Sequence, residues 1–211
     1  MNRNCRQTLL ATSLAVGAWL LAAPVHAQTV VEEWANVQRP AAPTLKPVTV
    51  EPQTTALLML DFMTQNCGKR PRCVASLPAM KNLLSQARAR NVLVVYSLIA
   101  NTTAADVLKD VAPQPGEPSV LSGPDKFVNT NLEQILKDTG IKSVIAVGTA
   151  AHGAVLYTAS GAAFRGLNVI VPVDGMSAND AYTELVTATV LTTAPTVSAR
   201  TTLTRTDMMK F

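Results

Sequence analysis

The residue best suited to acid–base chemistry is Asp61, which follows the apolar run 56–60 and precedes Phe62 and Met63. A carboxyl group with such neighbours is partly desolvated, which disfavours its charged form and suits a general acid or base. A capping or turn aspartate accounts for the same position equally well from spacing alone.

A second candidate is the small-residue segment Gly148-Thr149-Ala150-Ala151-His152, which enters a predicted helix. Backbone amides at such a helix start point toward a ligand and can hold an oxyanion or a carboxylate. His152 either hydrogen-bonds a substrate, orients the turn, or is a buried imidazole at the helix start, and the last interpretation is favoured. The hydroxyl groups of Thr149 and Ser97 are nucleophile candidates of lower rank, because neither has an evident base.

The cysteines offer a structural bridge rather than a metal site. Cys67 and Cys73 bracket a short loop with turn residues at both ends, and we expect a disulfide between them in an oxidising compartment. A reactive thiol pair and half of a metal site are the alternatives. No second Cys/His pair exists to complete a zinc site, so we expect no metal. The loop's basic residues could attract an anion: Lys69, Arg70 and Arg72.

The first 27 residues have the pattern of a cleavable secretory signal. Arg3 and Arg6 precede the apolar run 9–23, and a small-x-small exit ends at Ala27. The run is shorter than the roughly 20 residues that a membrane span needs. We therefore expect a periplasmic or secreted protein of 184 residues, without Cys5, and with no membrane association after cleavage.

Composition bounds the function of the mature chain. The formal charge of the whole chain is +4, but it falls to +2 once the two arginines of the signal are removed. No basic helix or aromatic–basic platform is present, so a nucleic-acid partner is not expected. Apolar residues make up 48%, which is ample for a folded core.

Two segments follow the predicted signal. Residues 28–54 are rich in proline and are expected to form an extended arm, lying on the domain or on a neighbouring subunit. Residues 55–211 alternate short apolar runs with helical periodicity. The expected strands are 56–60, 92–96, 144–147, 169–173 and 201–204.

Helices are expected between these strands. One is predicted over 76–90 and another over 151–165, and Ser177 is expected to cap a helix that runs to about Thr193. Thr130 and Glu133 form a capping box before a further helix. Strands alternating with helices predict an α/β fold, a three-layer α/β/α sandwich with a mainly parallel sheet. Ligands bind at the carboxyl ends of strands in such sheets, which directs attention to Asp61, Ser97, the segment 148–152 and Asp174.

The chain resembles the isochorismatase-like (cysteine hydrolase) family over residues 54–192. The similarity rests on four segments in a matching order and spacing: 57–62, 127–136, 144–155 and 166–174. The resemblance implies that Asp61 is the catalytic aspartate. It also implies a non-proline cis peptide within 148–150 and assembly into dimers or tetramers, hence a homo-oligomer.

Several positions depart from the family pattern. Ala154 occupies the place of the nucleophilic cysteine, and Leu121 that of the family lysine, six residues before Phe127. Lys126 is not the matching residue but could approach the pocket from a rearranged loop. Met63 replaces a metal-binding histidine of nicotinamidases, which agrees with the absence of a metal or other cofactor.

True isochorismatases are the branch of the family that works without the thiol. The resemblance implies that they use an aspartic acid as the proton donor to a vinyl ether, with a small residue at the cysteine position. Ala151-His152-Gly153-Ala154 is similar to their turn. The chemistry is coherent, because protonating an enol-ether carbon needs an acid and not a nucleophile.

The first hypothesis is therefore an exported hydrolase acting on a small molecule through Asp61, His152 and Lys126. Its expected substrate-binding residues are Phe62, Gly148, Thr149, Ala150 and Ala154. The second hypothesis is a non-catalytic relative that keeps the fold for ligand binding or assembly. Export argues against isochorismate as the substrate, because that metabolite is made and consumed in the cytosol.

Overall fold

The computed structural model describes residues 27–211, and the predicted signal peptide lies outside them apart from Ala27. Two compact units are present, one ending at Arg39 and the other spanning Pro40–Phe211. In the described part of the first unit, residues 30–36 form turns and bends, and the side chain of Trp34 is exposed. No helix in the described range is long and apolar enough to cross a membrane.

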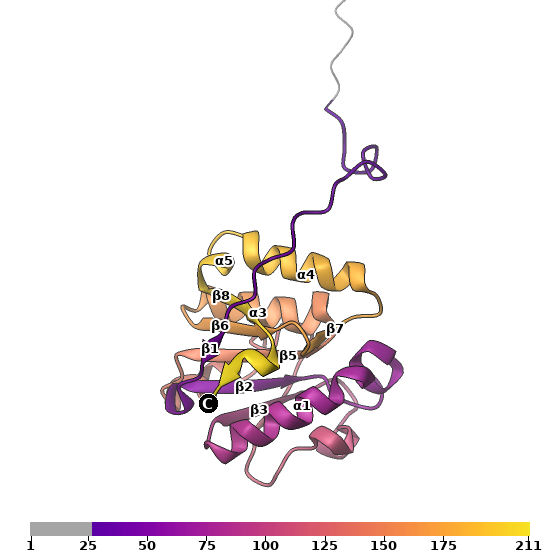
Figure 1. Ribbon diagram of the computed structural model, residues 1–211. Helices are drawn as coiled ribbons and strands as arrows, with labels where there is room; N and C mark the ends of the chain where they lie inside the picture. The colour runs from indigo at the N-terminus through magenta and orange to yellow at the C-terminus, as the bar shows by residue number, and fades with distance from the viewer. Residues whose placement is uncertain (1–26) are drawn as a thin grey trace, which may run out of the picture. The chain divides into compact units, whose positions relative to one another are not determined.

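The second unit is built on a parallel sheet in the order β4-β3-β2-β5-β6-β8, with β7 paired to β5 (Figure 1). Its central strand β2 is buried along its whole length, as the apolar run predicts. The strands are β1 Val48–Thr49, β2 Thr55–Leu60, β3 Leu93–Leu98, β4 Ser119–Leu121, β5 Ser143–Thr149, β6 Asn168–Pro172, β7 Met176–Ser177, β8 Thr201–Thr204 and β9 Met209–Lys210.

Helices cover both faces of this sheet. In Figure 1, α1 lies on one side of it and α3, α4 and α5 lie on the other. The α-helices are α1 Pro71–Ala89, α2 Leu132–Asp138, α3 Leu156–Phe164, α4 Ala181–Thr193 and α5 Val197–Arg200. The shorter helices are η1 Pro52–Thr54, η2 Cys67–Lys69, η3 Ala104–Asp106, η4 Lys109–Val111, the π-helical η5 Ala151–Val155 and η6 Thr206–Met208. The predicted α/β/α sandwich is confirmed.

The core divides into two clusters, one on each face of the sheet. Side chains alternate along β2, so that Leu58 and Leu60 pack on the side of α3 and α4, whereas Leu57 and Met59 pack on the side of α1. This alternation explains why a continuous apolar run is needed in the central strands.

The end of the predicted arm belongs to the folded unit. β1 pairs in parallel with β9, and Val50 is buried in the core. The Lys46 amide donates to the Leu203 carbonyl. Backbone pairing and burial therefore bring 45–54 onto the domain, and the compact unit begins at Pro40.

Two predicted helix starts are wrong. Asp180, not Ser177, caps α4 by accepting from the Thr183 amide, and Ser177 lies in β7 instead. Helix α1 begins five residues before the predicted Ser76, because Pro71 suits the first turn of a helix.

The capping box is not formed either. Thr130 accepts from the Leu132 amide, but the Glu133 carboxylate pairs with Lys137 and Arg165. The glutamate therefore ties α2 to the end of α3 instead of closing its own helix start.

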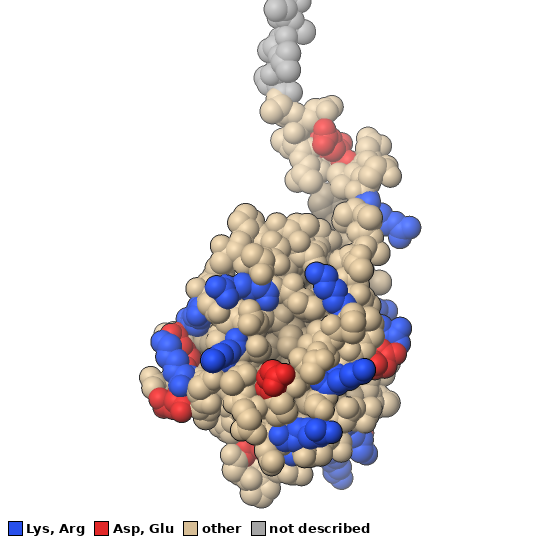
Figure 2. Space-filling model, turned by 60° about the vertical axis from the view of Figure 1, so that its left-hand side comes forward, with Lys and Arg blue, Asp and Glu red and all other residues tan. Residues whose placement is uncertain are grey.

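On one face of the molecule, surface charge is spread rather than gathered into a stripe. On the face shown in Figure 2, Lys and Arg side chains form small groups separated by uncharged surface. That distribution agrees with the small net charge of the whole chain, +4 over 211 residues.

Candidate active site

Strand register brings three candidate positions to one level at the carboxyl edge of the sheet. Leu60 pairs with Ser97 on one side and with Gly148 on the other, so Asp61 emerges between the ends of β3 and β5. Gly148 has φ +145°, and a Cβ there would collide with the Leu60 carbonyl oxygen. Glycine at 148 therefore allows the close approach of these two strand ends.

Asp61 is held by side chains from two different segments. Its residue is 5% exposed and adopts a left-handed φ of +59°. The Ser97 hydroxyl donates to Oδ1 at 2.6 Å, and the Asp61 amide donates to the Ser97 Oγ at 3.1 Å. Lys126 Nζ donates to both carboxylate oxygens at 2.8 Å.

Lys126 is fully buried, and its ammonium group is saturated. Besides Asp61, Nζ donates to the Gly123 carbonyl at 2.8 Å, which uses all three donors of the group. A buried charge without a partner is costly, whereas this pair is neutral overall. The structure thus answers what the sequence left open: Lys126 reaches Asp61, while Leu121 at the family lysine position is 61% exposed.

Helix α3 packs closely against the loop that carries Lys126. The Lys126 amide donates to the Thr158 hydroxyl at 3.3 Å. A Cβ at Gly161 would lie about 3.1 Å from Asp125 Oδ1 and the Phe127 ring. Gly161 therefore allows the lysine loop to pack closely against α3, whereas the alanines of this helix lie in the core.

The turn after β5 has the expected backbone. The Thr149–Ala150 peptide is cis, which confirms the prediction made from the family resemblance. The buried Thr149 hydroxyl donates to the Ser177 carbonyl at 3.0 Å. Ala154 lies in the π-helical η5, is 3% exposed and belongs to the core cluster on the α3 side.

His152 lies at the surface, whereas Phe62 lies in the core. His152 is exposed, so its interpretation as a buried imidazole is wrong. Its charge contributes to a lowered pKa of Asp180, although hydrogen bonds from Thr183 are the main cause. Phe62 is buried in the core on the α1 side, and its side chain packs there instead of facing solvent.

The predicted disulfide is present. Cys67 and Cys73 are bonded, with their Cα atoms 5.3 Å apart, and both are fully buried. The adjacent Asn66 side chain donates to the Thr149 carbonyl at 3.5 Å, which links this loop to the turn after β5. Among residues 27–211, no cluster of three or more His, Cys, Asp or Glu is arranged to hold a metal.

The basic residues near the disulfide are partly engaged. Both Arg72 nitrogens Nε and Nη2 donate to the Glu184 carboxylate, and this pairing raises the pKa of Arg72. Arg70 Nη1 donates to the Asn66 carbonyl at 3.1 Å. Lys69 is exposed. An anion site on this loop stays a prediction.

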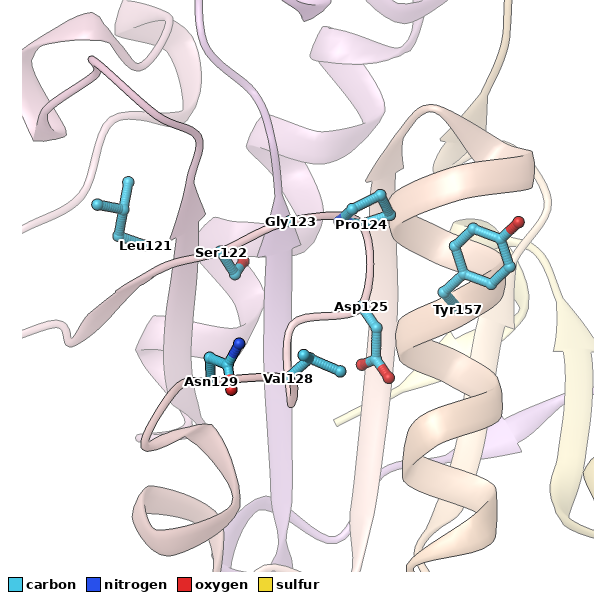
Figure 3. Close-up of a pocket in the computed structure, with 8 residues that line it drawn as sticks. All are labelled: Leu121, Ser122, Gly123, Pro124, Asp125, Val128, Asn129 and Tyr157. Carbon is cyan, nitrogen blue, oxygen red and sulfur yellow. The ribbon is translucent and has the colours of Figure 1, made fainter.

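A pocket of about 540 Å³ lies over the lysine loop (Figure 3). Gly123, whose carbonyl contacts the lysine ammonium, is one of its lining residues. Asp125 points between the loop and α3, which carries Tyr157 on the opposite wall (Figure 3). The lining residues are Leu121, Ser122, Gly123, Pro124, Asp125, Val128, Asn129 and Tyr157.

Residues 55–200 match the isochorismatase domain. The chain belongs to the isochorismatase family. It is 30% identical over 148 residues to a secreted isochorismatase effector of Verticillium dahliae, covering 64% of this chain and 78% of the relative.

Solved structures share the fold. A cysteine hydrolase from Pseudomonas syringae superposes with a TM-score of 0.68 at 19% identity, covering 78% of this chain and 94% of the other. An isochorismatase from Pseudomonas putida gives a TM-score of 0.67 at 17% identity, covering 77% and 93%. At these identities the likeness establishes the fold alone.

Two contributions to the site do not follow from the sequence. The sequence directs attention to Ser97 at a strand end and offers it as a nucleophile, but it does not reveal the hydrogen bonds of Ser97 to Asp61, although parallel register places the end of β3 beside the end of β2. Gly123 could not be recognised from the sequence as a partner of Lys126, because it contributes a backbone carbonyl, which every residue type has.

Proposed function

We propose that this chain is an exported hydrolase that cleaves a small molecule by acid–base chemistry at Asp61 and Lys126, without a thiol nucleophile. A vinyl ether is the proposed substrate class. The observation that carries the proposal is the buried Asp61–Lys126 pair at the carboxyl edge of the sheet, beside the turn 148–150.

The pair can supply and recover one proton. A proton passes from Lys126 Nζ to Asp61 and from Asp61 to the terminal vinyl carbon, which leaves an oxocarbenium ion. Water adds to this ion and releases a proton that returns to the pair. The hemiketal then collapses to a carbonyl compound and an alcohol, so the net reaction consumes only water.

The residue at the family's cysteine position supports chemistry of this kind. Ala154 provides no nucleophile, and both cysteines of the described chain are bonded to each other. Amide hydrolysis through a thioester has no residue to form the intermediate, whereas vinyl ether hydrolysis needs none.

The fungal relative bears on substrate and location. Because that protein is named a secreted isochorismatase effector, export alone does not exclude isochorismate for this chain. A disulfide agrees with an oxidising compartment, where the predicted signal would deliver the protein. Assembly into a homo-oligomer stays part of the proposal.

The test is a turnover screen of the oxidised mature protein with vinyl ethers, isochorismate included, and with amides and lactones. We expect turnover of a vinyl ether, and a fall of about 10²- to 10⁴-fold in kcat for Asp61→Asn, because a general acid contributes that much. Asp110→Asn is the matched control, since Asp110 pairs only with exposed Lys81 at the surface.

Unchanged turnover in Asp61→Asn would remove this residue from the mechanism. Absence of turnover with every substrate class, together with saturable stabilisation by a ligand, would favour the non-catalytic relative. Asp61→Asn leaves Lys126 buried without a counter-charge, so assays must be run below its measured melting temperature.

A further inference from the structure

The two oxygens of the Asp61 carboxylate have different surroundings. Oδ1 accepts from Lys126 at 2.8 Å and from Ser97 at 2.6 Å. Oδ2 accepts from Lys126 at 2.8 Å, and among the described residues it has no second donor. A carboxylate oxygen has about two acceptor sites, so Oδ1 is filled and Oδ2 has one left.

Ser97 creates this difference because it forms two hydrogen bonds with Asp61. Its hydroxyl accepts from the Asp61 amide at 3.1 Å while it donates to Oδ1 of the same residue. One buried side chain thus ties both the backbone and the carboxylate of Asp61, whose φ lies in the left-handed region. Rotation of the carboxylate would break the bond to Oδ1.

We propose that Ser97 is a positioning residue that anchors Oδ1 and thereby makes Oδ2 the oxygen that exchanges a proton with the substrate. The inference rests on the proposed function and assigns that reaction to one atom. The proton moves from Lys126 Nζ to Oδ2, the new O–H bond breaks as the substrate carbon–hydrogen bond forms, and the proton released by the adding water returns to Lys126 through Oδ2. The hydroxyl of Ser97 keeps its own proton throughout.

The register of the sheet explains why the residue at position 97 can position the Asp61 carboxylate. Ser97 pairs with Leu60, the residue directly before Asp61, so its side chain stands at the level where the carboxylate begins. The neighbouring Tyr96 belongs to the opposite core cluster and cannot replace it. Ser97 is 1% exposed, which keeps water from competing for Oδ1.

The test compares Ser97→Ala with Ser97→Thr, which keeps the hydroxyl, and with Ser160→Ala as a control for serine removal elsewhere. With a substrate that the wild type turns over, we expect Ser97→Ala to lower kcat about 10- to 100-fold, since small misplacements of a reacting group have effects of that size. KM should change less than about twofold, and Ser97→Thr should recover kcat to within about threefold of the wild type. Equal kcat in Ser97→Ala and the wild type would overturn the proposal.

Crystal structures of the same variants test positioning without any activity. We expect the Asp61 carboxylate to rotate or to occupy two conformers in Ser97→Ala and to keep its wild-type conformer in Ser97→Thr. A displaced carboxylate in a protein whose wild type turns over nothing supports the positioning role and removes the proposed hydrolysis. An unmoved carboxylate in Ser97→Ala overturns the positioning role whatever the kinetics show.

Discussion

Two consecutive residues of β3 belong to two buried polar networks that lie on opposite faces of the sheet. Ser97 joins Asp61 and Lys126 at the carboxyl edge. The Tyr96 hydroxyl donates to the Val111 carbonyl and accepts from Arg88. Both networks contain a cation, a carboxylate and a hydroxyl group. They differ in whether a proton is available for exchange.

The Arg88 network ties a long connection to the fold. Arg88 Nη2 donates to the Ala112 carbonyl, and Nε and Nη2 donate to the Glu117 carboxylate at 2.7 Å. Each contact anchors part of the segment between β3 and β4. The guanidinium of Arg88 stays protonated in proteins, so this network holds the segment in place and has no proton to give, as expected of a structural network.

The Asp61 network instead contains a lysine, whose ammonium group can release a proton to a carboxylate that is nearly but not completely buried. This difference is a physical criterion for distinguishing a candidate active site from a network that only stabilises the fold. Each network contains a carboxylate oxygen with a single donor, Oδ2 of Asp61 and Oε1 of Glu117, whereas a cation that can release a proton occurs in the first network and not in the second.

Lys126→Met should have the largest effect, because it removes the proton source and leaves a buried carboxylate without its partner. We expect loss of turnover and a fall of about 3–5 kcal/mol in the free energy of unfolding, measured by urea denaturation. Combining it with Asp61→Asn should restore part of that stability but no turnover. A double variant less stable than both single variants would contradict this account of the pair.

Arg88→Met should separate stability from activity. Its loss leaves the Glu117 carboxylate and the Tyr96 hydroxyl short of a donor, so we expect about 2–3 kcal/mol of destabilisation with kcat unchanged. Arg205→Met is the matched control, because Arg205 pairs with Asp207 at an exposed surface. Impaired kcat in the folded Arg88 variant would mean that the two networks are coupled.

Tyr96→Phe should have the smallest effect, about 1 kcal/mol from one hydroxyl. Tyr96 should also make the free energy of unfolding depend on pH. Burial, the main cause, raises the pKa of Tyr96 well above its ordinary value of 10.0. The unfolded chain therefore loses the phenolic proton first, and the stability that Tyr96 provides is complete below pH 10 and declines as the pH rises above it.

Denaturation curves between pH 9 and 11 measure this decline. The wild type should lose up to about 1.4 kcal/mol more per pH unit above pH 10 than Tyr96→Phe, which has no proton to lose. Parallel losses in the two proteins would show that the tyrosine does not titrate differently in the folded state.

The sequence was sufficient for much of the fold and for half of the site. Buried strands read directly as apolar runs, and Asp61 stands where one of them ends. Lys126 is a candidate from the sequence, but its contact with the carboxylate cannot be derived there, because the residue that reaches Asp61 depends on how the loop 122–125 folds over α3 and not on its distance from Phe127 along the chain. His152 shows the same limit in reverse, since a position in a turn does not determine which way the ring faces.

The bridge between Cys67 and Cys73 has a consequence for inhibitors. Compounds that inactivate cysteine hydrolases by alkylating a thiol would find none to attack in residues 27–211 of the oxidised protein. A protein produced in a reducing cytosol would instead present two thiols and give a misleading positive result in such a screen. If the proposed vinyl ether hydrolysis is correct, compounds shaped as oxocarbenium mimics, which need no covalent bond, are the appropriate starting point for this chain.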